Sequence, residues 1–101
     1  MIKAKFSIRG ADASFTVSGH SESAEAGKDI VCAAVSSAAL MAANTVTEIL
    51  GVAASEEMHD GYLNVSFVNS EAAADIVRGL RLHLEQLSLQ YPQFVKVTTE
   101  V

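Results

Sequence analysis

The sequence predicts an α+β fold, an antiparallel or mixed sheet that carries two helices in the order ββαββαβ. Several short segments alternate apolar and polar residues, which is typical of half-buried strands. Two longer segments repeat apolar residues with helical periodicity, and they separate the strands into groups. The chain has 101 residues, too few for two separate cores, so we expect a single domain over residues 1–101.

The first two expected strands form a hairpin. Apolar residues alternate with polar ones from Ile2 to Arg9, and Gly10-Ala11-Asp12 supplies a turn. The second strand follows, because Phe15 and Val17 alternate with small polar residues before the chain reaches Gly19 and His20.

A long helix is expected from Lys28 to Leu50, and Gly51 ends it. When its residues are placed at 100° intervals, the apolar ones occupy an arc of roughly 200°. An arc this wide predicts a helix that is buried on more than one side. The residues in the arc are Ile30, Val31, Ala34, Val35, Ala38, Met41, Ala42, Val46, Ile49 and Leu50.

The next two segments, Val52–His59 and Tyr62–Val68, form a second expected hairpin. Asp60-Gly61 lies between them, and Asp-Gly between two extended segments is a strong signal for a two-residue turn. The alternation places three apolar residues on the inner face of the hairpin, namely Leu63, Val65 and Phe67.

A second helix is expected from Glu71 to about Gln90, with Asn69 or Ser70 as its N-cap. Pro92 closes that region, and Val95–Val101 alternates as a last strand. The apolar stripe of the helix consists of Ile76, Val77, Leu80, Leu84 and Leu87.

Composition excludes several classes of protein. Twelve acidic residues against 7 basic ones give a net charge of −5, which argues against direct nucleic-acid binding. The apolar stretch Ile30–Ala43 is short for a membrane span, and the alternating N-terminus does not resemble a signal peptide, so we expect a cytoplasmic protein without a membrane partner. The single cysteine excludes an internal disulfide, and too few ligands surround it for a metal site. We expect no cofactor.

Chemistry-bearing residues gather around that cysteine. His20 ends a strand, a polar segment follows, and Cys32 lies near the start of the long helix, where the positive end of the helix dipole favours a thiolate. Asp29, Cys32 and Ser36 share one face of this helix. An imidazole beside the thiol, oriented by the carboxylate, would give the arrangement of a nucleophilic enzyme.

Spacing alone also permits plainer interpretations. Cys32 can be a small buried apolar residue, Asp29 can be favoured by the helix dipole alone, and Ser36 can serve packing. The remaining candidates fit solvated or structural roles, namely His20 in a loop and His59, His83, Glu22 and Glu25.

A longer motif adds to this interpretation. The chain reads Gly19-His20-Ser21, then Ala24-Glu25, and from Gly27 to Ser36 Gly-Lys-Asp-Ile-Val-Cys-Ala-Ala-Val-Ser. It resembles the signature of the ribosomal-processing cysteine protease Prp family, a Gly-His-small start followed by a loop and Gly-x-Asp-Ile-Val-Cys-Ala-Ala-Val-Ser. The resemblance extends to chain length and element order.

The resemblance implies a role for each residue of the motif. Cys32 would be the nucleophile of a cysteine endopeptidase, His20 its general base and acid, Asp29 a supporting carboxylate, and Ser36 a neighbour that shapes the site. The loop between His20 and the helix would close over substrate, and we expect it to become ordered only with substrate bound; its residues are Ser21, Glu22, Ser23, Ala24, Glu25, Ala26 and Gly27.

The resemblance also implies the substrate and the assembly. Family members are homodimers that remove the N-terminal extension of a large-subunit ribosomal protein after an aromatic residue, so that the protein can enter the ribosome. A domain with two helices on one sheet also leaves a face to cover, which agrees with a dimer. Glu22-Ser23 replaces a Gly-Tyr pair that is frequent in similar sequences, which implies a changed closure of the loop or a changed peptide preference.

Two other functions remain open at this point. The chain could be a non-catalytic, ribosome-associated interaction domain whose Cys32 is part of the core, or it could be a thiol acyltransferase. Reactivity of the folded Cys32 thiol, and its dependence on His20, distinguishes an enzyme from an interaction domain.

Overall fold

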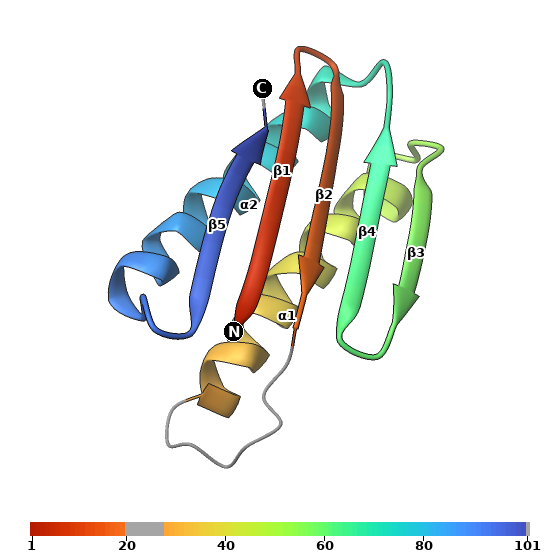
Figure 1. The fold of residues 1–101 in the computed structure, drawn as a ribbon. Helices are drawn as coiled ribbons and strands as arrows, with labels where there is room; N and C mark the ends of the chain where they lie inside the picture. The colour runs from red at the N-terminus through yellow and green to blue at the C-terminus, as the bar shows by residue number, and fades with distance from the viewer. Residues whose placement is uncertain (20–27, 101) are drawn as a thin grey trace.

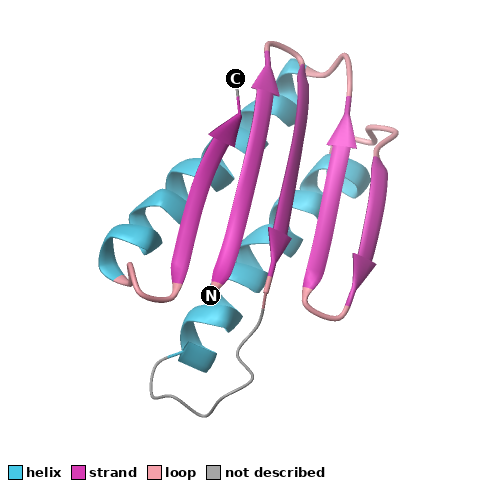
Figure 2. Ribbon diagram, viewed as in Figure 1, coloured by secondary structure: helices cyan, strands magenta, loops and turns pink. Residues whose placement is uncertain are grey.

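The computed structural model describes residues 1–19 and 28–100. Within these residues five strands form one mixed sheet in the order β3-β4-β2-β1-β5, and the helices cover one of its faces (Figure 1, Figure 2). The predicted α+β class and the order ββαββαβ are confirmed. The elements are β1 (Ile2–Arg9), β2 (Asp12–Ser18), α1 (Lys28–Asn44) with a π-helical end η1 (Thr45–Ile49), β3 (Ser55–His59), β4 (Tyr62–Phe67), α2 (Glu71–Gln90) and β5 (Val95–Glu100).

The strand pairing determines where the chain ends lie. Both predicted hairpins are present, and β2 joins them by pairing antiparallel to β4. Strand β5 pairs parallel to β1, from Ile2 opposite Val95 to Ser7 opposite Glu100. The N- and C-termini therefore lie at opposite ends of the sheet (Figure 1).

The core lies between the sheet and the helices. Alternation along the strands turns one set of side chains toward the helices, which buries Phe6, Phe15 and Val65 almost completely. The predicted inner face of the second hairpin is confirmed, and so is the stripe of α2, in which Ile76 and Leu87 are half-buried and the other three residues are buried. The side of α1 and η1 that faces the core contributes Val31, Val35, Ala39, Ala42 and Ala43 from α1 and Val46 from η1.

The prediction that α1 is buried on more than one side is wrong for the single chain. The sheet covers one side of the helix, while Ile30, Met41 and Ile49 remain 74%, 63% and 78% exposed. The apolar pattern shows which residues avoid water, but within one chain the sheet and α2 leave these three side chains largely uncovered. An apolar surface therefore runs along this helix.

The apolar stretch that begins at Ile30 is also longer than expected, so the prediction that it is too short for a membrane span is wrong. The helix continues past Ala43, and Ile30–Ile49, at 20 residues, is long and apolar enough to cross a membrane by length and composition. In the structure, however, one side of it packs against the sheet as a core helix does.

Side-chain hydrogen bonds to the backbone lie at the end of α1 and at the start of α2. The Thr45 and Thr47 hydroxyls donate to the carbonyls of Met41 and Ala43, at 2.7 and 3.1 Å, where α1 passes into its π-helical turn. Such bonds to preceding carbonyls compete with the regular helical ladder. Ser70 caps α2 as predicted, its hydroxyl accepting from the amide of Ala73.

Candidate active site

One flank of α1 carries the candidate nucleophile. Cys32, Ser36 and Leu40 follow one another at intervals of four residues and therefore lie on one side of the helix. All three line a cavity of about 220 Å³. Cys32 is half-buried, whereas Ser36 and Leu40 are exposed. The structure thus confirms that the thiol and the Ser36 hydroxyl share one face, and it places an opening beside them.

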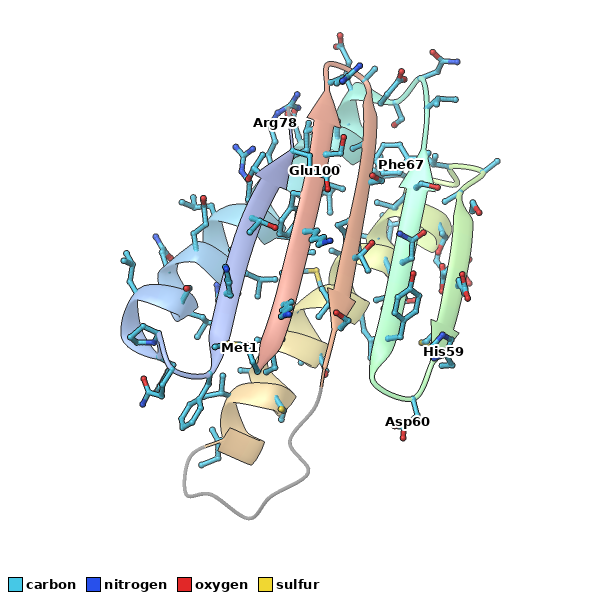
Figure 3. The ribbon with its side chains drawn as sticks, in the orientation of Figure 1. Met1, His59, Asp60, Phe67, Arg78 and Glu100 are labelled. Atoms are coloured by element: carbon cyan, nitrogen blue, oxygen red, sulfur yellow. The ribbon has the colours of Figure 1, made fainter. Side chains whose placement is uncertain are left out.

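The opposite wall of the cavity is the tip of the β3–β4 hairpin. Met58 to Tyr62 line it, around the predicted Asp60-Gly61 turn, in which Gly61 has a φ of 73°. Figure 3 shows His59 and Asp60 at this tip, at the end of the sheet where the chain begins. Ile2, Val17 and Leu63 of the sheet complete the lining. The cavity therefore lies between the first half of α1 and a hairpin that is distant in sequence.

Gly19 connects the end of β2 to this hairpin tip. Its amide donates to the carbonyl of Gly61 at 2.9 Å, and the residue lines the same cavity as Cys32. Gly19 has a φ of 96°, in the left-handed region that glycine tolerates. A Cβ at this position would meet the carbonyl of Met1. The backbone that leads to His20 in the sequence is therefore held between two strands.

Several predicted site residues lie outside the described part of the chain. These are His20 and the proposed substrate loop Ser21–Gly27, together with the side chain of Asp29. The backbone of Asp29 belongs to the first turn of α1. Of the predicted catalytic and supporting residues, the structure thus brings together Cys32 and Ser36.

Two other histidines have solvated positions, as expected. His59 stacks on Tyr62 with ring centroids 4.6 Å apart and an interplanar angle of 6°. Because Leu63 faces the helices, its neighbour Tyr62 points to the opposite face of the sheet, and the stacked pair lies there. Glu57 approaches His59 at 3.7 Å. His83 is exposed beside the groove between α1 and α2.

Sequence reasoning missed the hairpin tip as part of the site. The available signal was Met58, a large apolar residue two positions before the Asp60-Gly61 turn in an otherwise polar strand. Within the described ranges 1–19 and 28–100, no group of three or more His, Cys, Asp or Glu residues is arranged to hold a metal ion.

The arrangement suits nucleophilic chemistry. Cys32 is the fifth residue of α1, one turn from its start at Lys28. The first four amides of an α-helix have no acceptor within the helix, and they point toward its N-terminal end. A half-buried thiol, a cavity that a carbonyl group can enter and nearby backbone donors together fit an attack on an acyl group.

Comparison with known proteins identifies the family. The model of the family described as cysteine protease Prp matches residues 1–96. The chain belongs to this family. It is thus a member of a family of cysteine proteases, a class of hydrolases, and the resemblance drawn from residues 19–36 is confirmed.

Individual relatives agree with this assignment. Ribosomal processing cysteine protease Prp of Bacillus subtilis is 29% identical over 96 residues, which cover 87% of this chain and 86% of that protein. SMU.848 from Streptococcus mutans superposes with a TM-score of 0.84 at 29% identity, covering 98% and 96% of the two chains. Prp from S. aureus, solved in complex with a substrate peptide, has the same fold, with a TM-score of 0.88 at 18% identity and coverage of 99% and 100%.

Proposed function

We propose that residues 1–101 form one cysteine-protease domain in which Cys32 is the nucleophile. The observation that carries this proposal is the single cysteine of the chain. A cysteine protease needs a cysteine nucleophile, and Cys32 carries the only thiol of the chain, half-buried beside a cavity. A purely structural cysteine would be expected in the closed core, whereas Cys32 lines an open cavity.

In the proposed reaction His20 acts as general base and acid. The Cys32 thiolate attacks the carbonyl carbon of the scissile peptide bond, and a carbon–sulfur bond forms. The carbon–nitrogen bond then breaks as the His20 imidazolium gives its proton to the leaving amine, which leaves a thioester. Water, deprotonated by His20, attacks the thioester, and the carbon–sulfur bond breaks to release the acid and restore the thiolate.

Supporting roles fall to the residues around this pair. Asp29 orients the imidazole, Ser36 shapes the site, and the loop Ser21–Gly27 covers the bound peptide. The amides in the first turn of α1 stabilise the oxyanion, an effect worth about 2.7–4 kcal/mol per donor in known enzymes. Gly19 supports the role of His20, because the residue that directly precedes this histidine in the sequence lines the Cys32 cavity.

The proposed substrate is the N-terminal extension of a large-subunit ribosomal protein, cut in the cytoplasm before the protein is assembled into the ribosome. Two features support this. The Bacillus subtilis relative is a ribosomal processing protease, and the net charge of −5 complements a basic substrate.

The test is cleavage of a synthetic peptide that spans this extension, followed by mass spectrometry. We expect wild-type protein to give two products, the Cys32→Ala variant to give none, and the His20→Ala variant to be strongly impaired. Alkylation of folded Cys32 by iodoacetamide should also slow in His20→Ala. Cleavage retained by Cys32→Ala, or a thiol that reacts only in denaturant, would contradict the proposal.

We further propose that the protein acts as a homodimer through the outer side of α1. From Ile30 to Thr47 this helix carries no charged residue, and its outer side exposes Ile30 and Met41 there. Two copies related by a twofold axis can therefore cover this surface without burying a charge.

Replacement of one exposed residue tests the dimer. Met41→Glu places a charge on the shared surface and should convert the dimer to a monomer, measured by light scattering after size-exclusion chromatography. Leu89→Glu, at an 83% exposed position of α2, is the control and should leave the dimer intact. A monomeric wild-type protein, or a dimer that survives Met41→Glu, would contradict this assignment.

A further inference from the structure

The Cys32 cavity has an apolar wall on its hairpin side. Met58 of β3 is paired with Leu63 of β4, and directly opposed residues of two strands point to the same face. Leu63 is buried toward the helices, so Met58 also faces α1. Among residues 1–19 and 28–100, no strand lies on the outer side of β3, and Met58 is 62% exposed.

A second apolar residue lies on the helix side of the same cavity. Leu40 follows Cys32 by two helical turns on one flank of α1, and it is 41% exposed. Leu40 and Met58 both line the cavity that contains the thiol. Within the described residues, Asp60 at the hairpin tip is the one carboxylate in the lining. Leu40 and Met58 thus place apolar groups on two sides of the space beside Cys32, next to the polar residues Ser36, His59 and Asp60.

The size of the cavity suits one substrate side chain. At about 220 Å³ it is smaller than the roughly 300–1,000 Å³ typical of sites for whole small molecules. Leaving large apolar side chains in water is unfavourable by about 25 cal/mol per Å², so a ligand group that covers Leu40 and Met58 gains this free energy. Methionine adapts to the shape of its partner, and its sulfur makes favourable contacts with aromatic rings.

We propose that Leu40 and Met58 are specificity-determining residues that hold a large apolar substrate side chain next to the scissile bond. This inference rests on the proposed protease function, and it names the residues that select the peptide. The two residues approach the substrate from opposite sides, one from α1 and one from the edge strand. The hairpin tip therefore belongs to the substrate site, although it contributes no catalytic group.

The test is a matrix of variants and peptides. Starting from the extension peptide that wild-type protein cleaves, each large apolar residue within three positions of the cleaved bond is replaced by alanine in turn. Wild-type, Leu40→Ala and Met58→Ala proteins are compared on every peptide by kcat/KM. Leu89→Ala is the control, since it removes an exposed apolar side chain from α2, outside the cavity lining.

We expect each cavity variant to lower kcat/KM about 10-fold on the parent peptide, in the range typical of lost apolar contacts in a substrate pocket. On the one peptide that lacks the selected side chain, wild-type and variants should be equal, because the contact is already absent. Leu89→Ala should match wild-type throughout.

Two outcomes would overturn the inference alone: an unchanged kcat/KM in both cavity variants, or an equal loss on every peptide, which indicates a structural role. Failure of wild-type protein to cleave any peptide would instead overturn the proposed function, and this inference with it. Thermal unfolding of each variant confirms that the fold is intact, which is expected because both side chains are exposed.

Discussion

The two flanks of α1 carry similar residues and differ in what lies opposite them. One flank presents Ser36 and Leu40 to the β3–β4 tip, and the other presents Ser37 and Met41 to α2. The first cavity is about 220 Å³ and contains the thiol, whereas the second is about 690 Å³ and contains none. A serine and a large apolar residue are thus not enough to define the site. The thiol and the closely held strand end at Gly19 distinguish the first flank.

Moving the thiol from one flank to the other should have the largest effect. The double variant Cys32→Ala with Ala34→Cys keeps one cysteine per chain but places it on the side facing α2, because residues two apart differ by about 200° around a helix. We expect kcat/KM to fall at least about 10³-fold, as for loss of a nucleophile. The measurement is peptide cleavage, with alkylation to confirm a reactive thiol. Activity close to wild-type would show that the flank does not matter.

Two glycines provide a stability test of the same comparison. Gly19→Ala places a side chain at positive φ against the Met1 carbonyl and should destabilise the protein by about 1–3 kcal/mol. Gly79 lies in α2 beside the second cavity, and a Cβ there meets nothing within 4 Å. Gly79→Ala should therefore stabilise by about 0.5–1 kcal/mol. Chemical denaturation measures both, and equal changes in the two variants would argue against a closely held Gly19.

The smallest expected effect is a difference in kcat/KM between alanine variants of the neighbouring residues Ser36 and Ser37. Ser36→Ala removes a hydroxyl from the Cys32 cavity and should lower kcat/KM about 2- to 10-fold, the equivalent of one hydrogen bond of about 0.5–1.5 kcal/mol. Ser37→Ala removes the same group from the other flank and should leave kcat/KM unchanged. A loss of similar size in both variants would point to a general effect on α1.

Local signals predicted much of the fold. The bounds of α2, its Ser70 cap and the Asp60-Gly61 turn follow from patterns within a few residues, and all are confirmed. The shared face of Cys32 and Ser36 follows from helical spacing. The alternation of apolar and polar residues along the strands likewise predicted which strand side chains face the helices.

Other features depend on contacts between distant parts of the chain. Nothing near Cys32 in the sequence indicates that Met58 and Gly61 lie across the cavity from it, since this follows from the pairing of β2 with β4. The exposure of Met41 could not be predicted either, because hydrophobicity does not identify which surface covers a residue. β3 was expected to begin at Val52, but it begins at Ser55, because its pairing with β4 starts at that residue.

The parallel pairing of β5 with β1 has a practical consequence for handling the protein. Ile2 lines the cavity, and its amide donates to the carbonyl of Phe94 at 2.8 Å, so residues added before Met1 emerge at the mouth of the site. An affinity tag fused there can compete with a peptide for the same space. Glu100 lies at the far end of the sheet (Figure 3). A purification handle fused at the carboxyl end therefore leaves the site open for measurement.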